Sequence, residues 1–227
     1  MKNITRERSS ARRVQVLFLV VSCTVVSACT ASNADLTWVE PVQLASGEEV
    51  KVKRHVVVIQ ERAYGGGFLA APIYKTSSLE LQVGSASYPI WDAPMVPVLV
   101  DKDPTNGEWV VVAATSGCDT WLRNGRPRPP YWAFRLRNGQ WYRDAIPTGF
   151  LDRPANLFID FRTDDRSDKL NSEIEDRKKQ QFDSKQHPKS YNKVDTSYAE
   201  FDKGCSREPS DPIGKSELDL KSFRSLP

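Results

Sequence analysis

The chain has 227 residues, with 32 Lys and Arg against 29 Asp and Glu, two histidines and four cysteines. Five of the basic residues and one acidic residue lie in the first 13 positions, which leaves 27 basic and 28 acidic residues in the rest. This near-neutral remainder excludes the basic surface that nucleic acid requires, so we expect no nucleic-acid partner. The length suits one domain with a proper core and appendages.

The first 28 residues have the three zones of an export signal. A basic start is followed by a mostly apolar, uncharged run over Val14–Val26 and by the small residues Ser27 and Ala28. The run is shorter than the roughly 20 residues that a permanent membrane-spanning helix needs. The pattern therefore predicts a signal peptide over residues 1–28.

Val26-Ser27-Ala28-Cys29 resembles the lipobox of bacterial lipoproteins, in which the cysteine receives a diacylglycerol and becomes the mature N-terminus. The resemblance implies a lipoprotein whose Cys29 carries acyl chains, including palmitate. Several acyl chains together make a durable membrane anchor. It places the protein in the cell envelope, and Thr30 in place of Asp implies the outer membrane, facing the periplasm. Two alternatives stay open: processing at the looser Val20–Cys23 match, or an ordinary signal-peptidase site that leaves Cys29 without lipid.

After processing, Cys118 and Cys205 are the remaining cysteines. Two thiols in an oxidising envelope more often pair than stay free, so we predict a Cys118–Cys205 disulfide. It would tie the polar C-terminal segment to the main domain, and closing a loop of that length is worth about 4–5 kcal/mol in the chain-entropy model. The alternative role for Cys118 is that of a small buried hydrophobe.

Residues 29–37 are interpreted as a lipid-anchored polar tether, and the chain then takes a period of two from Trp38. Alternating apolar residues on either side of Ser46-Gly47-Glu48 predict two half-buried strands joined by a short hairpin with Gly47 at positive φ. Centring the turn on Gly47 pairs Leu44 with Val50 and Val42 with Val52.

Further strands are expected after a glycine-rich loop that contains Gly65, Gly66 and Gly67. The alternating or continuous apolar segments that indicate them are Leu79–Val83, Tyr88–Ile90, Met95–Val100, Trp109–Ala113 and Leu157–Phe161. Trp109–Ala113 is the expected central strand, and Leu157–Phe161 the expected last one.

Tyr131–Arg143 carries the clearest local signal, because Asn138-Gly139 between alternating apolar residues is typical of a two-residue hairpin turn. It pairs Leu136 with Trp141 and places Trp132, Phe134, Leu136 and Trp141 on one face, which we interpret as core. Just upstream, Arg126–Pro130 is expected to form a stiff polyproline-II segment.

Residues 162–227 form a polar C-terminal extension with a possible helix over 167–181, capped by Ser167 or Asp168. Only Leu170 and Ile174 give this helix an apolar stripe, which predicts weak docking. The expected fold is mainly β: an antiparallel sandwich or partly open barrel over 38–161, with a short helix and a charged, weakly ordered C-terminal extension.

The sequence contains few residues or motifs that are typical of catalytic sites. His55 and His187 are the only histidines, and neither belongs to a known catalytic motif. Asp101–Gly107 starts like a calcium loop, but its sixth position is Asn106 and its twelfth is Val112, so a solvated turn is the better interpretation. We expect no metal, no cofactor and no catalytic residue, and the dispersed carboxylates Glu108, Asp119, Asp144 and Asp152 do not single out a pair for glycoside cleavage.

Aromatic side chains supply the candidate ligand-facing residues, because exposed rings stack on sugars. Trp121, Tyr131 and Tyr142 are the candidates, with Trp91 as a further one. The competing interpretation is that most of these rings pack in the core, which is the usual place for them in a β-domain.

Two blocks resemble a family of uncharacterised envelope proteins in proteobacteria. One is the start Trp38-Val-Glu-x-Val-x-Leu-x-Ser-Gly47; the other runs from Cys118 through Gly125-Arg-Pro-Arg-Pro-Pro-Tyr131 into the aromatic hairpin. The resemblance covers residues 38–161 and weakens in the tail that holds Cys205. It implies the fold and the location but carries no activity.

The sequence therefore favours a non-catalytic, membrane-anchored envelope lipoprotein that binds or supports another envelope protein or a glycan. The alternative is an enzyme, or an accessory protein, that acts on envelope polysaccharide or peptidoglycan. The aromatics and the scattered carboxylates motivate this second hypothesis.

Overall fold

A computed structural model describes residues 32–60, 73–116, 118–161, 165–183, 193–194 and 205. The predicted signal peptide, Cys29, the residues Gly65–Gly67 and His187 lie outside these residues. No helix among the described residues is both long enough and apolar enough to span a bilayer.

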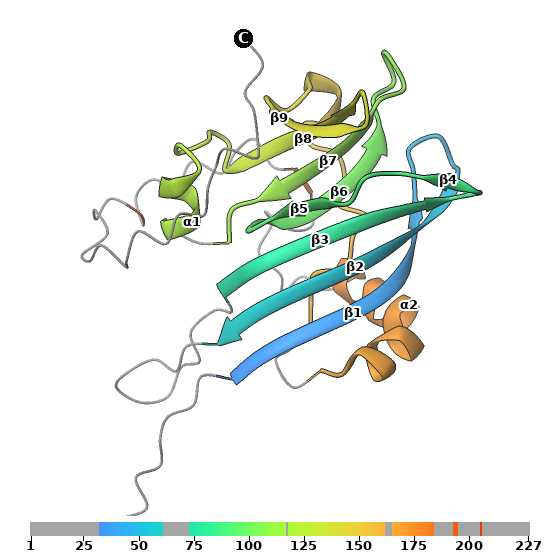
Figure 1. Ribbon diagram of the computed structural model, residues 1–227, viewed down its shortest axis with the longest axis vertical. Helices are drawn as coiled ribbons and strands as arrows, with labels where there is room; N and C mark the ends of the chain where they lie inside the picture. The colour runs from blue at the N-terminus through green and yellow to red at the C-terminus, as the bar shows by residue number, and fades with distance from the viewer. Residues whose placement is uncertain are drawn as a thin grey trace, which may run out of the picture. The chain divides into compact units, whose positions relative to one another are not determined.

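Two antiparallel sheets make up the domain (Figure 1). The first contains β1 (Ser32–Gln43), β2 (Glu49–Gln60), β3 (Ile73–Val83), β4 (Ala86–Ser87) and β5 (Trp91–Ala93). The second contains β6 (Val96–Lys102), β7 (Trp109–Ala114), β8 (Tyr131–Arg137) and β9 (Gln140–Asp144). The helices are α1 (Cys118–Arg123) and α2 (Ser167–Asp183), with a 3₁₀ turn at Thr148–Phe150. The mainly β, antiparallel fold is confirmed, and the two sheets do not join into a closed barrel over the described ranges.

β1 begins earlier than the sequence predicted. Residues 32–37 belong to this strand, so assigning them to a tether was wrong. Ala34 and Leu36 continue the alternation that starts at Trp38 and are buried at 4% and 1% exposure. Their polar neighbours Asn33, Asp35 and Thr37 made the stretch look like a linker, although they are only the outer face of a strand.

The β1–β2 hairpin has the predicted turn residue but a different register. Gly47 has φ 85°, as expected. Val42 pairs with Val50 and not with Val52, and Leu44 belongs to the loop, where its N–H donates to the Glu48 carbonyl at 2.8 Å. Because the register moves by two residues, each side chain stays on its predicted face.

The core lies between the sheets and beside them. One cluster joins Val52 and Leu79 of the first sheet to Val111 and Phe134 of the second. The other side of the second sheet is covered by Phe150, Ala155 and Val194, which belong to another buried cluster. β7 is buried along its whole length, and this confirms that Trp109–Ala113 lies in a central strand.

The β8–β9 hairpin confirms the Asn-Gly prediction. Asn138 and Gly139 have φ of 50° and 74°, and Leu136 pairs with Trp141. Phe134 and Trp141 are buried while Trp132 and Leu136 are half-buried, all packed in one cluster. These side chains face the space between the sheets.

Three predicted local structures are wrong. Tyr88–Ile90 is not a strand, and Ile90 is 59% exposed. Arg126–Pro130 is not a polyproline-II helix, because Arg126 has φ 56° and the Tyr131 N–H turns back to the Pro129 carbonyl. Leu157–Phe161 is buried but irregular, because the Phe158 N–H donates to the Glu40 carboxylate and the Ile159 N–H to the Gln181 side chain. Side-chain acceptors take the place of a neighbouring strand there.

Helix α2 lies along the outer edge of β1 (Figure 1). Ser167 Oγ accepts a hydrogen bond from the Thr37 N–H at 2.9 Å, and Asn171 bonds both to the Val39 N–H and to the Thr37 carbonyl. The predicted helix is confirmed, but its docking is not weak: polar side chains complete the backbone hydrogen bonds of an edge strand. Such cover prevents unwanted pairing between sheet edges.

Candidate functional site

A polar cleft of about 390 Å³ lies on the outer face of the second sheet. Phe134 faces the core between the sheets, so its strand neighbour Arg135, and Arg137 two residues on, face the other way. Both arginines line the cleft, together with the loop after β6 and the 3₁₀ turn; the complete lining is Asp103, Pro104, Thr105, Asn106, Arg135, Arg137, Pro147, Thr148, Gly149 and Phe150.

The loop after β6 is shaped by its own polar side chains. Asp103 Oδ1 accepts the Thr105 N–H at 2.8 Å, and Asn106 Oδ1 accepts the Glu108 N–H at 3.0 Å. The Gly107 N–H closes the turn on the Asp103 carbonyl at 2.7 Å. The expected solvated turn is therefore partly wrong, because Asp103 is 5% exposed and committed to protein contacts.

Two guanidinium groups and three carboxylates form one network at the cleft. Arg135 Nη1 lies 2.6 Å from Asp103 Oδ2 and 3.3 Å from Glu108 Oε2. Arg137 Nε lies 2.9 Å from Glu108 Oε1. Asp144 Oδ2 lies 3.1 Å from Arg135 Nε, without the geometry of a hydrogen bond, and 3.8 Å from Arg137 Nη2. With two positive and three negative groups, the network carries one net negative charge.

The network holds its buried carboxylates in the ionised form. The hydrogen bond from the Thr105 N–H, followed by that from Arg135, lowers the pKa of Asp103. Burial would raise the pKa of Glu108, but hydrogen bonds from Arg137 and Asn106 outweigh it and lower this pKa overall. For Arg135, burial is outweighed by the hydrogen bond to Asp103, which raises its pKa. None of these groups is prepared to give up or take a proton near neutral pH.

The cleft also keeps donors for a ligand. Arg137 uses Nε for its hydrogen bonds to Glu108, while its Nη groups form no hydrogen bond within the described part of the chain. Arg137 is partly exposed, as is Asp144 with 42% of its side chain. Tyr142 pairs with Arg135 across the β8–β9 hairpin and is half-buried on the same face. Donors, an acceptor and an aromatic side chain are thus brought to one surface.

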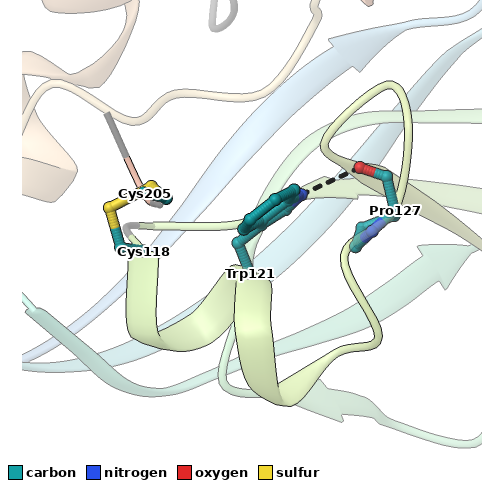
Figure 2. Close-up of a disulfide and its surroundings, with 4 residues drawn as sticks. All are labelled: Cys118, Trp121, Pro127 and Cys205. Atoms are coloured by element: carbon teal, nitrogen blue, oxygen red, sulfur yellow. Dashed lines mark hydrogen bonds between the residues drawn. A yellow bond between two sulfur atoms is a disulfide. The ribbon is translucent and has the colours of Figure 1, made fainter. Parts of the chain in front are cut away.

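The structure separates the predicted ligand-facing residues. Trp121 and Tyr131 are buried at 4% and 2% exposure, so neither ring can stack on a ligand; Trp91 is also buried. Trp121 Nε1 donates to the Pro127 carbonyl at 3.0 Å, which holds the loop after α1 (Figure 2). Tyr142 alone of the candidates stays accessible beside the cleft.

Cys118 and Cys205 form the predicted disulfide, at the start of α1 and one turn before Trp121 (Figure 2). Cys205 is buried at 6% exposure. Val194, at 0% exposure, anchors another part of the extension, since its N–H donates to the Arg153 carbonyl. The expectation of a weakly ordered extension therefore overlooked one apolar anchor inside it.

Of the carboxylates that the sequence left dispersed, Glu108 and Asp144 both contact the cleft arginines Arg135 and Arg137, while Asp152 pairs with Lys193. Asp103, Arg135 and Arg137 were missed as site residues. Their signal was the Arg-x-Arg alternation of Arg135 and Arg137, opposite the apolar face of the same hairpin. His55 bonds to Asp35 at 2.9 Å on the exposed face of the first sheet.

A second charge cluster joins α2 to the first sheet. Glu40, at 0% exposure, lies 3.1 Å from Arg54 Nη1 and 3.0 Å from Lys178 Nζ. Burial lowers the pKa of Arg54, and the charge of Glu40 opposes this shift. The cluster is enclosed, so its role is structural. Among the described residues, no group of three or more His, Cys, Asp or Glu side chains is placed to hold a metal ion.

No family model, no curated protein and no solved structure matches this chain. The resemblance to proteobacterial envelope proteins therefore remains a prediction from the two sequence blocks.

Proposed function

We propose that this protein is a lipid-anchored envelope protein that binds another envelope component, a protein or a glycan, through the cleft and without catalysis. The observation that carries the proposal is the paired state of the cleft carboxylates. A general acid needs a pKa raised toward neutrality, whereas the pKa values of Asp103 and Glu108 are lowered by their hydrogen bonds. Such a surface suits recognition rather than proton transfer.

A polar, hydroxyl-rich or amide-rich ligand fits this cleft best. Hydroxyl and amide groups both donate and accept, and they would meet the Nη donors of Arg137, which form no hydrogen bond within the described residues, and the partly exposed carboxylate of Asp144. Because the network is already formed, binding does not have to order it, and this lowers the entropic cost of association.

Mutation of Arg137 tests the binding proposal. The mature domain and its Arg137→Ala variant are incubated with envelope extract and with purified peptidoglycan, and captured or co-sedimented material is quantified. A hydrogen bond to a charged group is worth about 1.5–3 kcal/mol, so we expect roughly a tenfold or greater loss of binding.

Arg143→Ala is the matched control, because Arg143 is the nearby arginine that stacks on Trp132, with Cζ 4.6 Å from the ring centre. Equal retention by both variants, or no captured protein or glycan with the unmutated domain, would refute the proposal.

The second candidate is an enzyme acting on envelope polysaccharide, favoured by two carboxylates, Glu108 and Asp144, that contact the same arginine, Arg135. Soluble fragments released from peptidoglycan, and abolished by Glu108→Gln or Asp144→Asn, would support the enzyme. Co-sedimentation without release of fragments supports the binder.

The lipid anchor rests on the signal peptide and on the lipobox resemblance at Cys29. We expect the full chain to fractionate with membranes in a Gram-negative host and a Cys29→Ala variant to leave the membrane fraction. Membrane retention of the variant would exclude Cys29 as the anchoring residue.

A further inference from the structure

The early start of β1 fixes how far the domain can stand from its membrane. Only Thr30 and Ala31 separate Ser32, the first residue of β1, from Cys29 in the sequence. A residue spans at most ~3.6 Å of extended chain, so three steps reach about 11 Å. If Cys29 carries the lipid anchor proposed above, on which this inference rests, the first residue of β1 lies within about 11 Å of the lipid attachment point.

Two other strands of the first sheet have an end beside the first residue of β1. Ser32 pairs with Gln60 at the end of β2, and Ile59 pairs with Ile73 at the start of β3. The beginning of β1, the end of β2 and the beginning of β3 therefore lie together. With an anchor at Cys29, this is the end of the sheet that the short connection holds nearest to the bilayer.

The cleft lies near the opposite end of β1. The strand has 12 residues, and at ~3.3 Å per residue it extends for about 40 Å. At its far end the hairpin after β1 contacts β6: the Ala45 N–H donates to Asp101 at 3.1 Å, and Glu48 lies 2.8 Å from Lys102 Nζ. The next residue along the chain, Asp103, lines the cleft.

The outer face of the first sheet does not suit a flat contact with lipid. Its charges are of both signs: Lys53 pairs with Glu80, while Asp35 bonds to His55 and Asp92 to Thr76. The outward row of β1 contains Val39, which is 36% exposed, and the half-buried Pro41, and it is otherwise polar. Binding flat to a membrane requires an apolar face or a basic patch, and this polar face of mixed charge is neither.

We propose that the domain stands end-on on its membrane, with the Ser32, Gln60 and Ile73 end of the first sheet at the bilayer and the cleft about 40 Å above it. The partner at the cleft is then a component of the aqueous layer over the membrane, such as a polymer or a protein, and not a lipid headgroup of the anchoring bilayer. The short connection keeps this end of the sheet at the bilayer, and the polar outer face of the first sheet disfavours lying flat.

Site-specific fluorescence quenching tests the orientation. Lipidated protein carrying Lys75→Cys near the membrane end, or Asn106→Cys at the cleft, is labelled and reconstituted in vesicles of phosphatidylethanolamine and phosphatidylglycerol that contain nitroxide-labelled lipid. Cys118 and Cys205 are bonded to each other and do not take the label. We expect several-fold stronger quenching at position 75 than at position 106.

A variant with twelve Gly and Ser residues inserted between Ala31 and Ser32 is the control, and it should lose most of the difference because its domain reorients freely. Equal quenching at the two positions in the lipidated protein, or stronger quenching at position 106, would overturn the end-on orientation alone. Absence of lipid from the mature protein, measured by mass on the same sample, would overturn the anchor and the orientation together.

Discussion

At the scale of single residues, the stability of the domain depends on charges that the fold has removed from water. Glu40 is the clearest case, because its carboxylate contacts Arg54, Lys178 and the Phe158 N–H while being fully buried. Among the described residues, two buried nitrogen atoms of Arg54, Nε and Nη2, have no hydrogen-bond partner. The carboxylate of Glu40 therefore balances the positive charges of both Arg54 and Lys178.

Glu40→Gln should destabilise the protein strongly. Removing one partner of a buried pair costs about 3–5 kcal/mol because the remaining charge is left uncompensated. At about 2–4 °C per kcal/mol for a domain of this size, we expect the melting temperature to fall by roughly 10 °C. Glu80→Gln, which breaks the exposed pair with Lys53, is the control and should change stability by less than about 1 kcal/mol. Similar melting curves for both variants would contradict this role of Glu40.

The cleft carboxylates predict loss of stability in acid. The folded-state pKa values of Asp103 and Glu108 are lowered, so their contribution is complete above the unfolded pKa of about 4. It is lost as the pH falls through the lower folded values. Denaturant midpoints measured between pH 7 and pH 2 should fall below pH ~4, and Asp103→Asn should flatten this dependence. An unchanged slope in that variant would exclude Asp103 as a source.

At the scale of elements, α2 replaces a strand beside β1. Asn171 provides an acceptor for the Val39 N–H and a donor for the Thr37 carbonyl, and Pro41 has no N–H to leave open on the same edge. Lys178 then bonds to the Pro41 carbonyl at 2.6 Å. The apolar stripe of α2 is narrow and buries little hydrophobic area. The helix docks here because its hydrogen bonds to β1 supply the remaining stabilisation.

Asn171→Ala should loosen this edge. Two hydrogen bonds worth about 0.5–1.5 kcal/mol each are lost, so we expect the amide of Val39 to exchange with solvent about tenfold faster or more. Ser172→Ala is the control, because the Ser172 hydroxyl bonds to the Lys169 carbonyl within the helix. Equal protection of Val39 in the two variants would show that the hydrogen bonds of Asn171 do not hold this edge.

The sequence predicted correctly those elements whose conformation depends on residues close together in the chain. Asn138-Gly139 determined both the turn and the register of its hairpin, because few residues accept positive φ at two successive positions. Leu157–Phe161 misled because its apolar residues are buried as in a strand, yet its N–H groups bond to Glu40 and Gln181, far away in the sequence. The cleft was missed for the same reason: Asp103 and Arg135 meet only through the β6–β7–β8 pairing.

At the scale of the whole molecule, the C-terminal extension is tied to the domain at α2, at Val194 and at Cys205. The disulfide spans 87 residues of chain, and the chain-entropy model gives such a closure about 4–5 kcal/mol. Reduction should therefore lower the denaturation midpoint markedly and expose two reactive thiols. A Cys118→Ser, Cys205→Ser double variant that matches the oxidised protein in stability would contradict this estimate.

The central claim of a membrane-anchored binding protein depends first on the anchor at Cys29. The most direct test is the intact mass of the mature protein purified from the membranes of a Gram-negative host. The proposal predicts a chain that begins at Cys29 and carries a diacylglycerol with a further acyl chain on the new N-terminus. A mature chain that begins at Cys29 without lipid, or an unprocessed chain that begins at Met1, would contradict it.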